Sequence, residues 1–206
     1  MNDYSQHGEG KIIHEFFKNK KGVLLSLGEN DGKTLSNVLG LIEVGWIAHL
    51  VEPSEHCFNE LKNRHSENKN VNCYKLAIGN SNSLVDFYES GTHLGTGDTS
   101  LLSSIDKNEI KRWGKTAKFE SKKTQCLTFE SFIKEAEILN FDLISIDCEG
   151  LDFDILKQID FIKYTPSMVV VETNSVDNQK YIDLMASFGY SIHYKNYCNI
   201  IFTKWN

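Results

Sequence analysis

Short apolar runs alternate with apolar residues at helical spacing along the first part of the chain. The runs over 23–27, 47–51 and 71–78 predict buried strands. Apolar residues three or four positions apart over 35–42 predict a helix between the first two strands, and Ser54 is a favourable N-cap for a helix after the second. Repeated strand–helix units imply parallel strands joined by right-handed crossovers.

The same alternation returns in the second half of the chain. A helix is expected over 128–139, with Thr128 as its cap, and an apolar strand over 143–146 follows it. A further helix over 153–159 leads to a strongly apolar strand over 168–171. These elements extend the parallel sheet by two more strands.

The C-terminal segment breaks the parallel pattern. A helix around 181–188 is stopped by Gly189, and two strands close in sequence, 191–194 and 199–203, are expected to pair antiparallel. The fold class is therefore α/β: a Rossmann-like, doubly wound, mostly parallel seven-stranded sheet with a C-terminal antiparallel hairpin. Its strand order is inferred by analogy. We expect one domain over residues 1–206, because this length is ordinary for a single core.

The middle of the chain departs from this alternation of strands and helices. Residues 84–88 alternate like an exposed strand, and 91–104 form a loop rich in Gly, Thr and Ser. The stretch 107–123 then holds seven basic residues around Trp113. This stretch is either a solvated helix or mobile lid, or a guide for an anionic acceptor such as an acidic or phosphorylated sugar.

Composition and charge argue against several classes of protein. A net charge of −6 argues against nucleic-acid binding, and no apolar run approaches the roughly 20 residues of a membrane span. The polar segment 1–11 lacks a secretory signal, and five scattered cysteines without a C-x-x-C pair indicate reduced thiols. The sequence therefore predicts a cytoplasmic protein without a dedicated metal site, and leaves its oligomeric state open.

Polar residues follow the carboxyl ends of four predicted strands. Gly28-Glu29-Asn30-Asp31-Gly32, Glu52, Asp147 and Glu172 stand at these positions. In open parallel sheets, ligands bind beyond the carboxyl ends of the strands. We therefore expect these residues to surround one ligand site.

The first turn argues against a pyrophosphate. A G-x-G-x-x-G turn would place glycine at positions 30 and 33, where Asn and Lys stand, and the carboxylates of Glu29 and Asp31 would repel phosphates. A zwitterionic amino-acid cofactor tolerates these acids better. Glu52 is placed to accept hydrogen bonds from two ribose hydroxyls. Nucleoside binding is thus favoured over a merely structural turn.

Five ordered motifs resemble those of FkbM-type methyltransferases. They are Tyr4-Ser5-Gln6-His7-Gly8-Glu9, Ser26 to Gly32 with Ser36-Asn37, Glu52-Pro53, Ala77-Ile78-Gly79 and Ile146-Asp147-Cys148-Glu149-Gly150. The resemblance covers nearly the whole chain. It implies S-adenosylmethionine as cofactor and methyl transfer, commonly to hydroxyl groups of sugars or secondary metabolites.

The resemblance also implies which residues hold the cofactor. Its amino-acid end would contact Gly28, Glu29, Asn30 and Gly32, its ribose Glu52, and its adenine Ala77 to Gly79; Gln6, Pro53 and Asp147 belong to the matched motifs and are also expected to line its site. The chain departs from the family at two positions that usually carry acids, Ser26 and Gly10. Glu29 or Asp31 could supply the carboxylate that Ser26 lacks.

Asp147, Glu172 and His93 are the candidate catalytic residues. A hydroxyl acceptor must lose its proton to a nearby base, whereas methyl transfer itself depends mainly on positioning. His193 is a further candidate, and Glu149 is interpreted as a brace for the following helix. Asp147, Glu172 and Asn174 could also share a magnesium ion, although a divalent metal is not the expected cofactor.

The sequence thus predicts an S-adenosylmethionine-dependent O-methyltransferase acting on a small molecule or glycan. Two alternatives remain. A nicotinamide-dependent oxidoreductase is disfavoured by the missing second and third glycines, while a catalytically inactive partner protein is kept open by Ser26 and Gly10.

Overall fold

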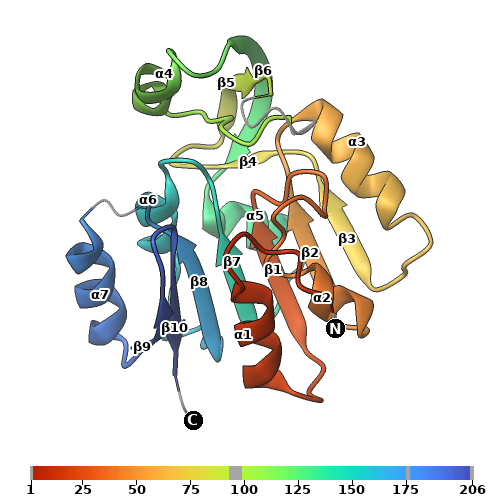
Figure 1. Cartoon of the computed structure of the whole chain (residues 1–206), viewed down its shortest axis with the longest axis vertical. Coiled ribbons are helices and arrows are strands. Elements are labelled where there is room, and N and C mark those ends of the chain that lie inside the picture. The colour runs from red at the N-terminus through yellow and green to blue at the C-terminus, as the bar shows by residue number, and fades with distance from the viewer. Residues whose placement is uncertain (1, 93–98, 175–176, 205–206) are drawn as a thin grey trace.

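A seven-stranded sheet forms the centre of the computed structural model, which describes residues 2–92, 99–174 and 177–204 (Figure 1). The strand order is β3-β2-β1-β7-β8-β10-β9. Strand β10 runs antiparallel to both neighbours, and all other pairs are parallel. The predicted fold class is therefore confirmed. The strands are β1 Val23–Leu27, β2 Ile47–Val51, β3 Val71–Tyr74, β7 Leu143–Ile146, β8 Met168–Glu172, β9 Ser191–Lys195 and β10 Asn199–Thr203.

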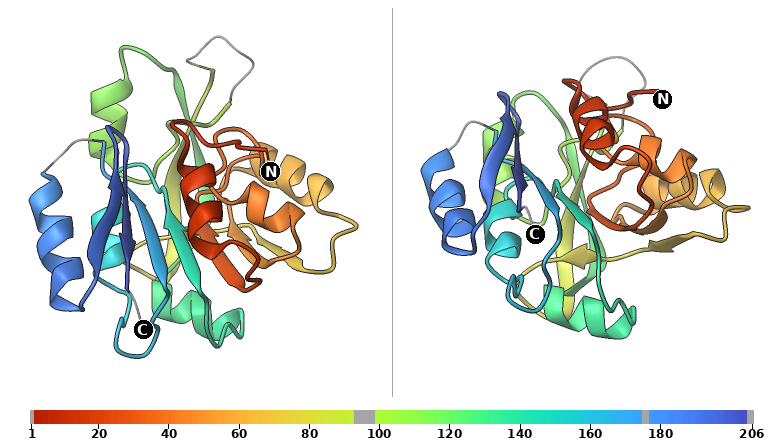
Figure 2. Two further views of the ribbon diagram at one scale, coloured as in Figure 1. Left: turned by 60° about the horizontal axis from the view of Figure 1, so that its bottom comes forward. Right: turned by 90° about the horizontal axis from the view of Figure 1, so that it is seen from below.

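Helices cover both faces of this sheet (Figure 2). Alternate strand residues divide between two cores: Leu24 and Val170 face one side, and Leu25 and Val171 face the other. The first core includes residues of α1 Glu9–Phe17, α2 Leu39–Glu43 and α3 Glu55–Arg64, and the second includes residues of α5 Phe129–Glu135, α6 Asp152–Leu156 and α7 Asn178–Ser187. No helix of the described residues is long and apolar enough to cross a membrane.

A second sheet stands at the carboxyl ends of the central strands, and the sequence did not predict it. Its order is β4-β6-β5, with β4 Ala77–Ile78, β5 Ser83–Ser90 and β6 Phe119–Leu127, and α4 Lys107–Trp113 lies beside it (Figure 1). The expected single strand over 71–78 is wrong, because the chain leaves the central sheet after Tyr74 and pairs with β6 instead. The strand expected at 84–88 is confirmed within β5, but it is not exposed throughout, because Phe87 is buried.

The helix expected over 35–42 begins late. Asp31 accepts hydrogen bonds from the N–H groups of Lys33 and Thr34, and Ser36 Oγ accepts from the N–H of Leu39, where α2 begins. Leu35 adopts a φ of +58° outside the helix. The expected caps are confirmed: Ser54 accepts from the N–H of Cys57, and Thr128 from that of Ser131. The loop before α2 is therefore long enough to line a site.

Candidate active site

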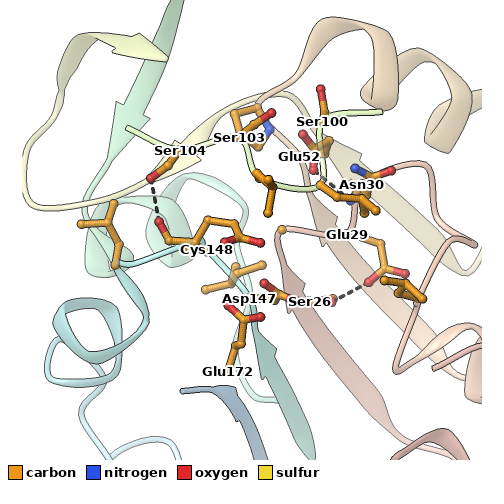
Figure 3. Close-up of a pocket in the computed structure, with 18 of the residues that line it drawn as sticks. Ser26, Glu29, Asn30, Glu52, Ser100, Ser103, Ser104, Asp147, Cys148 and Glu172 are labelled. Atoms are coloured by element: carbon orange, nitrogen blue, oxygen red, sulfur yellow. Dashed lines mark hydrogen bonds between the residues drawn. The ribbon is translucent and has the colours of Figure 1, made fainter. Parts of the chain in front are cut away.

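A cavity of about 310 Å³ lies beyond the carboxyl ends of β1, β2, β7 and β8 (Figure 3). Most of the residues expected at the site line it: Gln6, Gly28, Glu29, Asn30, Glu52, Pro53, Ala77, Ile78, Asp147, Glu172 and Asn174. Gly32 does not line the cavity, and His93 lies outside the described residues. His193 lies elsewhere, with its ring 5.5 Å from that of Phe16.

Two glycines shape the turn after β1 for different reasons. Gly28 has a φ of +82°, and a Cβ atom there would lie 1.8 Å from the backbone oxygen of Asp147. Gly32 also has a positive φ, but its Cβ would meet Leu61 of α3 at 2.6 Å. Gly28 therefore allows β1 and β7 to approach at the cavity floor. Gly32 instead leaves room for the side chain of Leu61 to pack against the turn.

Glu29 supplies a carboxylate at the place where Ser26 departs from the family pattern. Its oxygens accept hydrogen bonds from Ser26 Oγ at 2.6 Å and Ser36 Oγ at 2.5 Å. Burial raises the pKa of Glu29 to about 7, despite the lowering effect of these hydrogen bonds. Asp31 instead organises the backbone of the following turn. Of the two candidates, Glu29 is thus the one beside Ser26.

The second departure, Gly10, is explained by a neighbouring acid. A Cβ atom at position 10 would lie 2.7 Å from Oδ1 of Asp3. That oxygen accepts hydrogen bonds from the N–H and the hydroxyl of Ser5, and Ser5 Oγ accepts one from the N–H of Gly10. The Asp3 carboxylate therefore occupies the space that a side chain at position 10 would enter.

Glu52 is buried at the end of β2 and faces the cavity. Its Oε2 accepts a hydrogen bond from the N–H of Asn30 at 2.8 Å, and its Oε1 accepts from the N–H of Ser54 at 2.7 Å. Each oxygen keeps capacity for one more donor. Burial raises the pKa of Glu52 to about 7, and the charges of Glu29 and Glu89 act in the same direction.

Three acids gather where β7 and β8 end. Carboxylate oxygens of Asp147, Asp152 and Glu172 lie within 4.8 Å of one another, and Figure 3 shows Asp147 and Glu172 together at the cavity. Burial, followed by the charge of Asp152, raises the pKa of Asp147 to about 7. Burial and the charge of Asp147 raise the pKa of Glu172 well above its ordinary value. The three carboxyls therefore resist full ionisation unless a positively charged group beside them offsets their repulsion.

The brace expected from Glu149 is provided by Asp152 instead. Asp152 accepts hydrogen bonds from the N–H groups of Cys148 at 2.7 Å and Gly150 at 3.1 Å, which fixes the turn before α6. Glu149 adopts a φ of +46° and lines the cavity, and its backbone oxygen accepts from Ser104 Oγ. The interpretation of Glu149 as a brace was therefore wrong.

Several cavity residues were missed by sequence reasoning. The segment 100–105 crosses the cavity from the second sheet, and Tyr197 and Asn199 also line it. Trp113, at the centre of the basic stretch, lines the cavity as expected of a residue near the acceptor. The Ser-rich composition of 91–104 was a usable signal, because such loops often carry binding residues. Nothing local to Tyr197 or Asn199 indicated that the terminal hairpin reaches the site.

The cavity is acidic, whereas three of the seven residues of the basic stretch pair with acids outside the cavity lining. Carboxylates of Glu29, Glu52, Asp147, Glu149 and Glu172 line the cavity, and no lysine, arginine or histidine does so within the described part of the chain. In the basic stretch, Arg112 pairs with Glu109 at 3.1 Å, Lys123 with Asp86 at 2.8 Å, and Lys122 with Glu89. These pairs reduce the positive charge available to a ligand.

A family model described as the methyltransferase FkbM domain matches residues 26–192, which is most of the chain. The chain belongs to this family. The resemblance found in the sequence motifs is therefore confirmed, and with the fold it places the protein among the S-adenosylmethionine-dependent methyltransferases. No curated protein matches the sequence.

Solved structures share the fold of this FkbM-domain protein at low sequence identity. Precorrin 8w decarboxylase from Methanobacterium thermoautotrophicum has a TM-score of 0.54 and 10% identity, covering 98% of this chain and 91% of its own. Ribosomal protein L11 methylase from Lactobacillus delbrueckii subsp. bulgaricus has a TM-score of 0.51 and 11% identity, with coverages of 96% and 78%. At such identities, the likeness concerns the fold alone.

Proposed function

We propose that this FkbM-domain protein transfers a methyl group from S-adenosylmethionine to a hydroxyl group of a sugar, glycan or secondary metabolite. The observation that carries the proposal is one cavity with Glu52 at the end of β2 and Asp147 at the end of β7. The cofactor supplies a methyl group on a positively charged sulfonium, which leaves as a neutral thioether when the methyl group is transferred. The protein's task is then to orient two ligands and exclude water.

The cavity lining suits this cofactor. Glu52 keeps acceptor capacity on both oxygens and is proposed to hold the ribose hydroxyls. Gly28, Glu29 and Asn30 would contact the amino-acid end together with Gln6. The adenine would lie along the apolar lining contributed by Pro53, Ala77 and Ile78. Several carboxylates around the cavity also favour a ligand that carries a sulfonium and an ammonium group.

The acceptor is proposed to bind near Asp147. The side chains of Glu172, Trp113 and Tyr197 line the same cavity, so an acceptor there would meet both carboxylates and aromatic rings. Asp147 would accept the hydrogen bond of the acceptor hydroxyl and take its proton as the methyl group is transferred. The acidic lining favours a neutral acceptor over the anionic one suggested by the basic stretch, and over nucleic acid.

We also propose a cytoplasmic location, and two features of the cavity weigh against the alternative functions. All five cysteines are among the described residues and none forms a disulfide, which supports a reducing, cytoplasmic location. The oxidoreductase alternative finds no support at the β1 turn, where Glu29 faces the cavity. Glu29 beside Ser26 also weakens the case for an inactive partner protein.

Calorimetric titration with S-adenosylmethionine and, separately, with NAD tests the cofactor. We expect saturable binding of the former and none of the latter. Methyl transfer from labelled cofactor to a panel of sugar and phenolic hydroxyl acceptors then tests the reaction. Binding of NAD alone would contradict the proposal, and cofactor binding without transfer to any acceptor would favour the inactive partner.

Replacing Asp147 by asparagine should lower turnover by about 100-fold or more, because a positioned proton acceptor contributes typically 10²- to 10⁴-fold. Cofactor affinity should change little. Single-turnover kinetics at saturating cofactor would measure the transfer step. Asn178→Ala, at the start of α7 outside the cavity lining, serves as the control. Full activity of Asp147→Asn would remove Asp147 from the reaction.

Cofactor affinity should rise with pH between about 6 and 8. Burial raises the pKa of Glu52 to about 7, so the free protein holds this carboxyl protonated below that pH. Hydroxyl donors favour the ionised form, and binding therefore strengthens as pH rises, by up to about tenfold over this range. The Glu52→Gln variant should show a smaller dependence in calorimetry. Equal pH dependence of both proteins would contradict the ribose assignment.

A further inference from the structure

Asp147, Glu172 and Asn199 stand at the same edge of the central sheet, at the ends of the neighbouring strands β7, β8 and β10. The residues next to them in sequence, Ile146, Val171 and Ile200, all pack into the core that includes α5, α6 and α7. Because side chains alternate along strands, Glu172 and Asn199 face the opposite side, where α1 lies. Asp147 directly follows β7, and its carboxylate lies within 4.8 Å of that of Glu172. Glu172 and Asn199 are also direct partners across β8 and β10, so their side chains are neighbours.

The buried acid Glu9 determines how the Asn199 amide is oriented. Glu9 Oε1 accepts hydrogen bonds from Asn199 Nδ2 at 2.8 Å and from Asn196 Nδ2 at 2.6 Å, and its other oxygen accepts from the N–H of His7. Although burial alone would raise the pKa of Glu9, these hydrogen bonds outweigh it and lower the pKa, so the group is an ionised acceptor. The Asn199 nitrogen therefore faces Glu9, and its oxygen faces away.

Two buried oxygen atoms at the corner formed by Asp147, Glu172 and Asn199 have no hydrogen-bond donor. Asn199 is 5% exposed and Glu172 is 9% exposed, and neither Oδ1 of Asn199 nor Oε2 of Glu172 has a hydrogen-bond partner within the described part of the chain. Both residues line the cavity, together with Asp147. The corner thus presents an amide oxygen and two carboxylates, and no cationic side chain among the described lining residues faces them.

We propose that Asp147, Glu172 and Asn199 bind a hard divalent cation, Mg²⁺ or Mn²⁺. Carboxylate and amide oxygens are the ligands that these ions prefer. Asp152 would add negative charge while it holds the turn before α6. Three acids so close together favour a divalent cation over a monovalent ammonium group, because the double charge offsets more of their repulsion. Asn174, which the sequence suggested as a third ligand, also lines the cavity.

The cation site goes beyond the proposed function. Only the use of the cation in catalysis rests on the proposed methyl transfer. A cation at this corner would bind the acceptor hydroxyl oxygen beside Asp147 and favour loss of its proton. Binding of the ion itself requires neither cofactor nor acceptor. The test can therefore use the purified full chain with the metal alone.

Titration with Mn²⁺, followed by electron paramagnetic resonance of the free ion, tests the site directly. We expect one Mn²⁺ per chain, displaced by Mg²⁺. Glu172→Gln and Asp147→Asn should each weaken binding by roughly tenfold or more, as losses around metal sites commonly do. Glu120→Gln removes an exposed acid from β6 and should bind as the wild type does. Circular dichroism would establish that each variant is folded.

Two results would overturn the cation site. The first is absence of Mn²⁺ binding to the wild-type protein at millimolar concentration, which depends on no variant. The second is unchanged affinity in a folded Glu172→Gln or Asp147→Asn protein, because the ion would then lie elsewhere. Neither result bears on cofactor binding, so failure of the cation site and failure of the methyltransferase proposal can be told apart.

Discussion

Replacing Gly28 by alanine is expected to destabilise the protein by about 2–5 kcal/mol and to abolish cofactor binding. The φ of +82° at this position is unfavourable for any residue with a Cβ atom. A Cβ atom would also lie 1.8 Å from the backbone oxygen of Asp147, so β1 and β7 would have to separate at the floor of the cavity. Urea denaturation would measure the free energy of unfolding.

Gly91 offers a matched control for this substitution. A Cβ atom at Gly91 would meet nothing within 4 Å, and its φ is not in the left-handed region. Gly91→Ala should therefore change the free energy of unfolding by less than about 0.5 kcal/mol. If Gly28→Ala were as stable as Gly91→Ala and still bound cofactor, the close approach of β1 and β7 would not be a requirement of the site.

The Glu52→Ala variant should bind S-adenosylmethionine more weakly by about 1.5–3 kcal/mol, the usual contribution of hydrogen bonds to a charged group. This corresponds to a dissociation constant about 10- to 150-fold higher. Glu52 also accepts the N–H groups of Asn30 and Ser54, so its loss loosens the β1 turn as well as the ribose contact. Calorimetry on the folded variant would measure the affinity.

The Glu52→Gln and Glu67→Ala variants separate these two effects. Glutamine keeps an acceptor oxygen and a similar volume but loses the charge, and should fall between wild type and Glu52→Ala. Glu67→Ala removes an exposed acid beyond the end of α3 and should leave affinity unchanged. A dissociation constant that is the same in wild type and Glu52→Ala would show that Glu52 does not contact the cofactor.

The sequence by itself located most strands of the central sheet, although not their order. Apolar runs such as 23–27 and 168–171 are short and continuous because these strands are buried on both faces. Helix starts at Ser54 and Thr128 were also readable, because a cap bonds to backbone only three residues away. Polar residues at the carboxyl ends of parallel strands then had to meet at one edge, which placed Glu52 and Asp147 at one cavity.

Other features depend on the tertiary structure, because no local sequence pattern indicates them. Strand β6 is polar along most of its length and is held by pairing with β5, so its sequence carries no strand period. Asn199 reaches the site only because the terminal hairpin packs beside β8, and its amide is oriented by Glu9, 190 residues away. Hydrogen bonds between such distant residues depend on how the chain folds back. The corner formed by Asp147, Glu172 and Asn199 therefore exists only in the folded protein.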